Sequence, residues 1–152
     1  MRWSEIEKVP CPVAQAMAVI GDSWTVLILR DALRGATRFE EFQASTRAAR
    51  ATVSDRLSHL VDHGVMEKVQ YELHPPRYEY RLTPRGRALQ PVLMMLSHWS
   101  ESHLPVKTRS TGRRHTTCGH RFSPVVTCSE CGDPVTPEAV SYDRSKVPAP
   151  QP

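Results

Sequence analysis

The chain has 152 residues, enough for one ordinary domain with a small appendage, and its 39% of hydrophobic residues predicts that part of it packs poorly. The net charge of +4 fits a nucleic-acid partner without requiring one. The sequence contains no run of about 18 apolar residues, and its first residues, MRWSEIEKVP, lack the apolar segment of a secretory signal. We therefore expect a cytoplasmic protein that does not span a membrane, with its four cysteines present as thiols or metal ligands.

Two helices are predicted at the start of the chain. Pro12 suits the first position of a helix over VAQAMAVIG, because its missing N–H has no helical partner there, and Gly21 ends this helix. Asp22 and Ser23 are typical capping residues of a second, largely buried helix that stops at Gly35.

Two shorter helices follow. RFEEFQAS places Phe39 and Phe42 on one face of the third helix. After the turn TRAA, the stretch ATVSDRLSHLVDHGV predicts a fourth helix that Gly64 ends. Its apolar stripe comprises Val53, Leu57, Leu60 and Val61. Its opposite face is polar, which in an arbitrary helix means only a solvated surface.

The period of the pattern then changes from that of a helix to that of a strand. MEKVQY and RYEYRLT alternate, and the intervening ELHPP predicts a loop, so we expect a β-hairpin with an extended tip. A last helix restarts at Thr83-Pro84. Its apolar stripe exceeds what the core of such a domain needs, so it predicts a homodimer interface made of Leu89, Val92, Leu93, Leu96 and Trp99.

This order of elements is that of a winged helix-turn-helix, in the α+β class but mainly α, with a C-terminal dimerisation helix and a small zinc-ribbon-like tail. In that arrangement the fourth helix enters the major groove of double-stranded DNA and the hairpin tip reaches the flanking backbone. The candidate DNA-binding residues are Arg38, Arg50, Ala51, Thr52, Ser54, Arg56, Ser58 and Arg77. Asp55 either reads a base or has a structural role, as a capping residue or in an ion pair with Arg50 or Arg56.

Several motifs resemble the HxlR-type transcriptional regulators, a branch related to the MarR winged-helix proteins. The resemblance covers roughly residues 9–103, and its motifs are a Cys-Pro before the first helix, a Gly-x-x-Trp, an Arg-Phe-x-x-Phe and a Pro-Pro-Arg-Tyr-Glu-Tyr-x-Leu-Thr wing. It implies a homodimer that binds an inverted-repeat operator and controls neighbouring genes. The sequence departs from the family at the turn before the recognition helix, where Arg47, Ala48, Ala51 and Thr52 replace a common Gly-Ile or Pro-Gly-Ile pattern. The base preference therefore cannot be taken from a relative.

Cys11 is a candidate redox sensor. In some members of the family the matching cysteine senses electrophiles or oxidants, and a thiol at a helix N-cap is favoured as a thiolate by the backbone dipoles. The alternative is a small, inert residue near a dimer interface.

The composition changes after Leu104. Residues 105–114 form a basic linker, and residues 105–121 contain five basic and no acidic side chains. HTTCGH and CSECGD then resemble two zinc knuckles, which predicts a structural Zn²⁺ site made of His115, Cys118, Cys128 and Cys131, with His120 as a rival for the fourth place. The alternative is a loose tail with free or disulfide-linked cysteines.

The expected domains are thus the winged helix-turn-helix with its dimerisation helix (1–104), the linker (105–114), a zinc-ribbon-like module (115–143) and a disordered tail (144–152). The sequence shows no phosphate loop, nucleophile elbow or recognisable carboxylate cluster, so we expect no enzyme. A DNA-binding regulator is the leading prediction. The alternative is a winged-helix adaptor that binds proteins and has no sequence-specific affinity for DNA.

Overall fold

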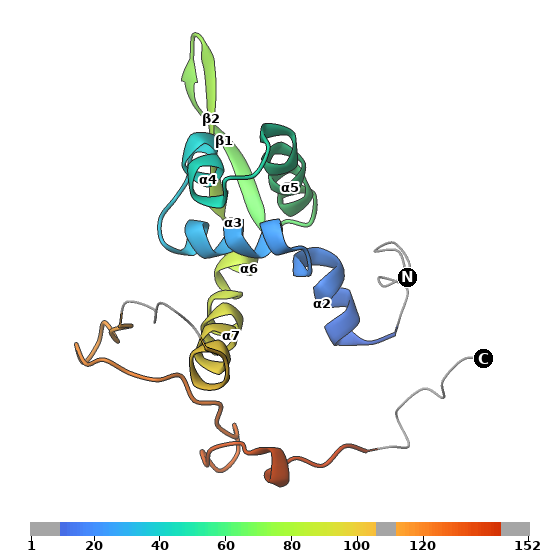
Figure 1. The fold of residues 1–152 in the computed structure, drawn as a ribbon, viewed down its shortest axis with the longest axis vertical. Helices are drawn as coiled ribbons and strands as arrows, with labels where there is room; N and C mark the ends of the chain where they lie inside the picture. The colour runs from blue at the N-terminus through green and yellow to red at the C-terminus, as the bar shows by residue number, and fades with distance from the viewer. Residues whose placement is uncertain (1–9, 106–111, 144–152) are drawn as a thin grey trace. The chain divides into compact units, whose positions relative to one another are not determined.

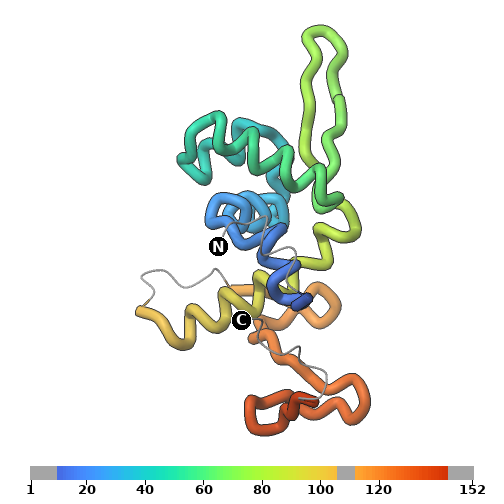
Figure 2. The backbone as a smooth tube through the Cα atoms, turned by 90° about the vertical axis from the view of Figure 1, so that its right-hand side faces the viewer, coloured from blue at the N-terminus to red at the C-terminus, as the bar shows by residue number. Residues whose placement is uncertain are grey.

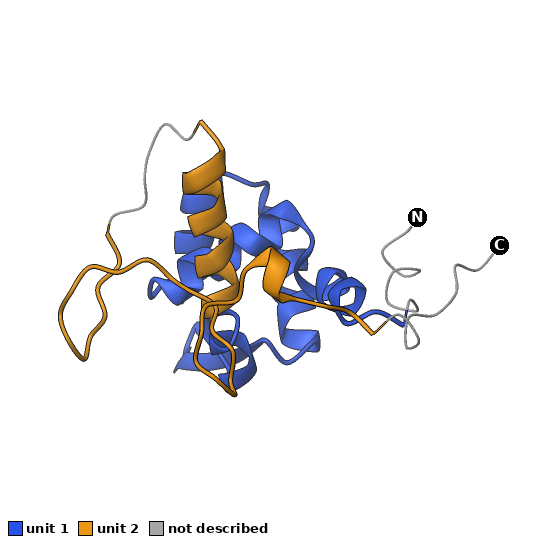
Figure 3. Cartoon of the chain, turned by 90° about the horizontal axis from the view of Figure 1, so that it is seen from below, with its two compact units in different colours: residues 1–90 blue, residues 91–152 orange. Residues whose placement is uncertain are grey.

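The computed structural model describes residues 10–105 and 112–143, and the chain divides into two compact units, Met1–Gln90 and Pro91–Pro152 (Figure 3). The prediction of disorder at 144–152 lies outside the described residues, as does most of the predicted linker. The elements are α2 (Pro12–Ile20), α3 (Ser23–Leu33), α4 (Phe39–Thr46), α5 (Arg50–Asp62), β1 (Met66–Leu73), β2 (Pro76–Leu82), α6 (Pro84–Arg87), α7 (Gln90–His103) and the short 3₁₀ helix η1 (Pro137–Ala139) (Figure 1).

The first two helices begin and end where their local signals predict. Pro12 occupies the first turn of α2 and Gly21 is its C-cap. At the start of α3, the Asp22 carboxylate accepts hydrogen bonds from the backbone N–H groups of Trp24 (3.0 Å) and Thr25 (3.1 Å). These bonds satisfy two of the N–H groups that have no partner within the helix.

The core of the first unit lies between α3, α4, α5 and the base of the hairpin. α3 packs against both α4 and α5, and α5 contacts β1. The apolar side chains without exposed surface include Ile28, Leu29, Phe42, Val53, Leu57 and Leu60. The predicted stripe of the fourth helix is therefore confirmed in three members, whereas Val61 is only half-buried.

The turn between α4 and α5 contains Arg47 in the left-handed conformation, at φ 55°. This conformation is costly for a residue with a Cβ. Ala48 is buried directly after it, and the Thr46 hydroxyl donates to the Phe42 carbonyl oxygen at 2.7 Å. Arg47 thus lies where the chain must reverse, at the turn where the sequence differs from the HxlR-type pattern.

The hairpin is longer than predicted. β1 and β2 pair antiparallel from Met66 and Leu82 up to Leu73 and Pro76, so the turn consists of His74 and Pro75 only. The expected loop ELHPP was wrong because its outer residues continue the ladder. At the base of the hairpin, the Tyr80 N–H donates to the Thr37 carbonyl oxygen at 2.7 Å, which joins the start of α4 to β2.

The predicted last helix is broken in two. α6 ends at Arg87 and α7 begins at Gln90, so Leu89 lies in the junction and not on the helix as predicted. Gly86 explains why α6 lies so close to the hairpin, since a Cβ at this position would come within 2.1 Å of the Val65 carbonyl oxygen. Among the described residues no single helix is long and apolar enough to cross a membrane, and α2 and α3 would reach such a length only as a pair bent by 80°.

Candidate nucleic-acid interface

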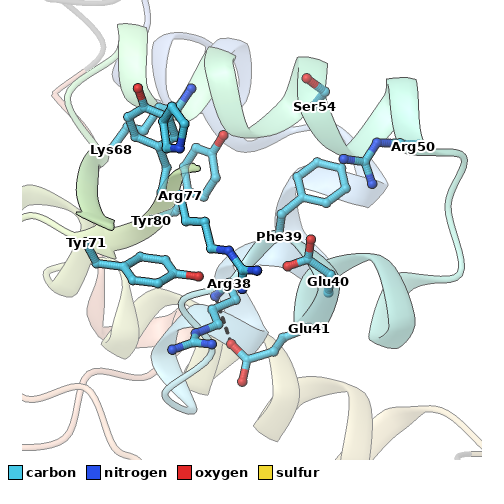
Figure 4. Close-up of a pocket in the computed structure, with 12 residues that line it drawn as sticks. Arg38, Phe39, Glu40, Glu41, Arg50, Ser54, Lys68, Tyr71, Arg77 and Tyr80 are labelled. Atoms are coloured by element: carbon cyan, nitrogen blue, oxygen red, sulfur yellow. Dashed lines mark hydrogen bonds between the residues drawn. The ribbon is translucent and has the colours of Figure 1, made fainter. Parts of the chain in front are cut away.

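A cleft of about 760 Å³ opens between the N-terminal ends of α4 and α5 and the hairpin, which we call the wing. Figure 4 shows its lining side chains pointing toward one another from three parts of the first unit. Four of them are exposed cations, and each comes from a different segment: Arg38, Arg50, Lys68 and Arg77. Glu40 and Glu41 also line the cleft, so the four cations exceed the carboxylates by two. An excess of positive charge in a concave surface raises the local affinity for phosphate groups.

Aromatic rings support three of these cations. The Arg50 guanidinium lies 4.5 Å from the centre of the Phe39 ring, Arg38 lies 4.8 Å from Tyr71, and the Lys68 ammonium lies 4.4 Å from Tyr78. The attraction between a cation and a ring face stabilises the pair by on the order of 0.5–1 kcal/mol at an exposed site. It also restricts the cation's side chain, so less conformational entropy is lost when a ligand binds. The arrangement therefore positions the charges in advance.

Arg77 is held differently, by an ion pair across the wing. Its Nε lies 3.2 Å from a carboxylate oxygen of Glu72, and both side chains are well exposed. Exposed pairs of this kind contribute between 0 and about 1 kcal/mol, so a phosphate can replace the carboxylate at little cost.

Glu41 stabilises the segment that carries Arg38. Its carboxylate accepts hydrogen bonds from the backbone N–H groups of Arg38 and Thr37, both at 2.8 Å. Both bonds lower the pKa of Glu41 below its ordinary value, and the bond from Arg38 has the larger effect. The carboxylate thus stays charged and fixes the backbone immediately before α4.

The candidate residues of the fourth helix fall into two groups. Ser54 lines the cleft, Ala51 and Ser58 are exposed beside it, and Thr52 is half-buried. Arg56 faces the other way, toward the start of α3. Its Nε is 3.9 Å from the Asp22 carboxylate, and this nitrogen is buried with no hydrogen-bond partner.

The structure also answers the question of Asp55. The two arginines considered as its partners are engaged elsewhere, Arg56 with Asp22 and Arg50 on the Phe39 ring. The alternative that Asp55 forms a structural ion pair with either of them was therefore wrong. The capping role was wrong as well, because Asp55 lies inside α5, whose N-cap is Ala49. Asp55 is exposed on α5, where it can face a ligand.

Several members of the cleft were not among the predicted site residues, including Lys68, Tyr71 and Tyr78 of the wing. The alternating pattern of the wing strands placed them on a hairpin, but it did not show which face turns toward α4 and α5. One signal could have identified Lys68. It pairs with Tyr80 across the ladder, which places its ammonium group beside the tyrosines of the opposite strand.

The other candidate residues lie outside the cleft. Cys11 is the N-cap of α2, as predicted, and it is half-buried with a free thiol. On α7, Val92, Leu96 and Trp99 are 44%, 51% and 54% exposed, whereas Leu93 is half-buried. Leu89 is half-buried in the junction before this helix.

The four predicted metal ligands are brought together in two pairs. His115 Nδ1 is 3.4 Å from Cys118 Sγ, and Cys128 and Cys131 share one turn, in which the Gly132 N–H donates to the Cys128 carbonyl oxygen at 2.9 Å. The pKa of the Cys128 thiol is lowered by neighbouring hydrogen-bond donors. The largest effect comes from the Cys131 backbone N–H, followed by the Glu130 backbone N–H and the Cys131 thiol. Within residues 10–105 and 112–143, no cluster of three or more metal-binding side chains forms, so the structure does not join the two pairs.

A helix pair across a tight turn, an exposed second helix and a two-stranded wing beside it define a winged helix-turn-helix protein. Residues 19–108 match the family of HxlR-like helix-turn-helix proteins, so the chain belongs to that family and is a transcriptional regulator of the HxlR type. It is 38% identical over 133 residues to an HTH-type transcriptional regulator of Mycobacterium tuberculosis. The aligned region covers 85% of this chain and 82% of the relative.

Two solved structures extend the comparison. PA1607, a proposed transcription factor, matches with a TM-score of 0.80 and 37% identity, over 92% of this chain and 99% of its own. The oxidised form of the redox regulator HypR matches with a TM-score of 0.58 and 31% identity, over 63% of this chain and 100% of its own. These relatives are named as regulators or transcription factors.

Proposed function

We propose that the protein acts in the cytoplasm as a homodimer that binds an inverted-repeat operator, with α5 in the major groove of each half-site and the wing on the flanking backbone. The observation that carries this proposal is the cleft, in which exposed cations of α5, the wing and the segment before α4 converge. A protein-docking surface would not need four cations gathered on one concave face, whereas a surface that binds the phosphates of DNA would.

The composition of α5 supports direct contact with bases. Ala51, Ser54 and Ser58 are small and exposed, so the helix axis can approach the base edges closely. Arg50, at the start of the helix, can reach a guanine or a phosphate. Arg56 is assigned a smaller part than the sequence suggested, because its buried Nε faces Asp22.

The dimer is proposed to form through α7. A helix with three large apolar side chains about half exposed, and with no fully buried residue, loses solvent-exposed apolar surface when a second copy covers it. The inverted repeat follows from the two-fold symmetry of such a dimer.

A response to oxidants is proposed through Cys11. It is a free, half-buried thiol at the N-terminus of α2, and 63% of the chain is similar to a redox regulator. Cys11→Ser should then abolish the effect of an oxidant on DNA affinity while leaving the affinity of the reduced protein unchanged. An identical oxidant response in the variant would remove Cys11 from the mechanism.

DNA binding is tested by gel shift with a duplex taken from upstream of the gene, at two salt concentrations. We expect the affinity of the full chain to fall steeply with salt, because phosphate contacts release counterions. A chain that binds no DNA under either condition would favour the protein-docking adaptor instead.

Variants separate the two kinds of contact. Arg50→Ala and Ser54→Ala should each change the tolerance for particular base pairs by about 1–3 kcal/mol. Arg77→Ala should weaken all sequences alike and reduce the salt slope by about one. Arg34→Ala, an exposed arginine outside the cleft, is the matched control and should bind as the unchanged protein does.

The dimer is tested separately with Leu96→Glu, which places a charge on the exposed stripe of α7. We expect monomers in light scattering and a large loss of operator affinity, since one half-site offers about half of the contacts. Ser102→Glu, an exposed polar position on the same helix, is the control. An unchanged protein that is monomeric at micromolar concentration would contradict the proposed dimer.

A further inference from the structure

The C-terminal unit contains two turns of the same construction, 13 residues apart. In the first knuckle, residues 113–122, the His115 N–H donates to the His120 carbonyl oxygen at 2.9 Å and the Gly119 N–H donates to the His115 carbonyl oxygen at 2.7 Å. In the second knuckle, residues 126–135, Cys128 and Gly132 repeat these bonds, to Asp133 and to Cys128, each at 2.9 Å. Figure 2 shows the knuckles as two closed loops, orange and red.

The equivalence extends beyond the loops to their stems. Phe122 donates to Arg113 in the first knuckle as Val135 donates to Val126 in the second. A single β-bridge closes each loop, Arg114 with Arg121 and Thr127 with Pro134. The two glycines have nearly the same left-handed φ, 73° at Gly119 and 77° at Gly132. The sequence differs between the knuckles, but the backbone is the same.

This equivalence decides between His115 and His120. His115 and Cys118 occupy in the first knuckle the positions of Cys128 and Cys131 in the second, whereas His120 corresponds to Asp133, whose carbonyl oxygen closes the turn. The Nδ1 of His115 is 3.4 Å from Cys118 Sγ. Two such donors on one tetrahedral Zn²⁺ ion would be about 3.6 Å apart, given the usual Zn–N and Zn–S distances.

Apolar burial cannot hold these knuckles together. In the described part of the tail, 112–143, Pro124 is the one buried residue, and Val125 is 72% exposed. A segment of this size without a core needs a disulfide, a metal ion or a partner. The His115–Cys118 pair cannot form a disulfide, but histidine and cysteine together are ordinary zinc ligands.

We propose that the two knuckles close on one structural Zn²⁺ ion held by His115, Cys118, Cys128 and Cys131 of the same chain. Each knuckle supplies two ligands, and only residues 123–125 connect the knuckles, so a rotation within this connector can bring the pairs face to face. Four protein ligands leave no open position, so the ion supplies folding energy and no chemistry.

The zinc module would begin directly beside the proposed dimer helix. The Arg113 side chain donates to Ser97 Oγ at 2.5 Å and to the Glu101 carboxylate at 3.3 Å, which ties the stem of the first knuckle to α7. Closing the knuckles on zinc would therefore fix the stem whose Arg113 contacts α7.

The proposal is tested on the full chain purified under reducing conditions without chelator. Elemental analysis should find close to one zinc per chain, and Co²⁺ substitution should give the absorption of a tetrahedral site with thiolate ligands. Cys128→Ser and His115→Ala should lose most of the metal, whereas His120→Ala and Cys11→Ser should retain it. A protein that contains no zinc and takes up none from added Zn²⁺ would overturn the site, as would metal loss in His120→Ala but not in His115→Ala.

A mixing experiment tests whether one chain supplies all four ligands. Cys118→Ser chains and Cys128→Ser chains are unfolded, refolded together and assayed for zinc. If each chain builds its own site, the mixture binds no more metal than either variant alone. Recovery of zinc in the mixture would show ligands shared between copies and would contradict the same-chain site.

A third measurement uses folding. Removing zinc with a chelator should increase hydrogen exchange across residues 113–135 and leave the exchange of α3 and α5 unchanged, because the metal stabilises only the knuckles. Equal exchange of the knuckles with and without metal would contradict a structural role for zinc.

Discussion

The two units of this chain are stabilised in different ways. In the first unit, side chains from three helices and the wing bury one another completely, as Ile28 and Phe42 illustrate. In the second unit, the described residues bury only Pro124, and α7 exposes much of its apolar stripe. The first unit therefore has an apolar core of its own. The second unit needs additional partners, and we propose a second copy of the chain for α7 and a zinc ion for the knuckles.

The largest expected effect is the loss of stability when a large side chain is truncated in one unit and compared with a truncation in the other. Phe42→Ala removes a ring without exposed surface between α4 and the rest of the core, and it should lower the free energy of unfolding of the first unit by about 3–5 kcal/mol. Denaturant unfolding followed by circular dichroism measures this loss. Val125→Ala in the exposed connector of the tail should change it by less than about 0.5 kcal/mol. Equal losses in both variants would mean that the tail shares the core of the first unit.

A smaller effect is expected at the start of α3. Asp22→Ala removes the acceptor of two backbone N–H groups and leaves the half-buried Arg56 without its carboxylate, so we expect a loss of about 1–2 kcal/mol. Asp55→Ala, an exposed aspartate on α5, is the matched control for stability and should be nearly neutral. Thermal unfolding of both variants measures the difference. If Asp55→Ala were as destabilising as Asp22→Ala, the cap would not explain the loss.

The smallest effect is a gain. Arg47→Gly removes the Cβ from a left-handed position, so the first unit should become more stable by about 0.5–1 kcal/mol despite the greater freedom of the unfolded chain. For a domain of this size the melting temperature should rise by a few degrees. Arg34→Gly, at the right-handed C-cap of α3, should give no such gain. A lower melting temperature in Arg47→Gly would show that the arginine side chain contributes more than its backbone costs.

Much of the first unit could be predicted because its signals are local. Pro12, Gly21 and Asp22 act on backbone groups within a few residues, and the apolar spacing of α5 is independent of what covers it. The predictions failed where a distant contact decides the local structure. The helix breaks before Gln90, and the wing ladder extends to Pro76, because pairing and close approach to other segments are worth more than local preference.

The candidate interface divides in the same way. Arg38, Arg50 and Arg77 could be selected from the sequence because they lie on or beside a recognition helix and a wing. The partners that hold them, Phe39, Tyr71 and Glu72, could not, because a side chain's direction depends on how the elements pack. The same reason explains why Arg56 faces Asp22 and not the cleft.

The sequence by itself determined the family, the order of helices and wing, and the positions of Cys11 and of the cysteine pairs, since all of these depend on residue type and short spacing. Only the tertiary structure decided which cations share one cleft and which histidine stands in the position of a cysteine. Both outcomes depend on hydrogen bonds and packing between residues that short spacing does not relate, such as the bond that joins Thr37 to Tyr80 and the turn that aligns His115 with Cys128.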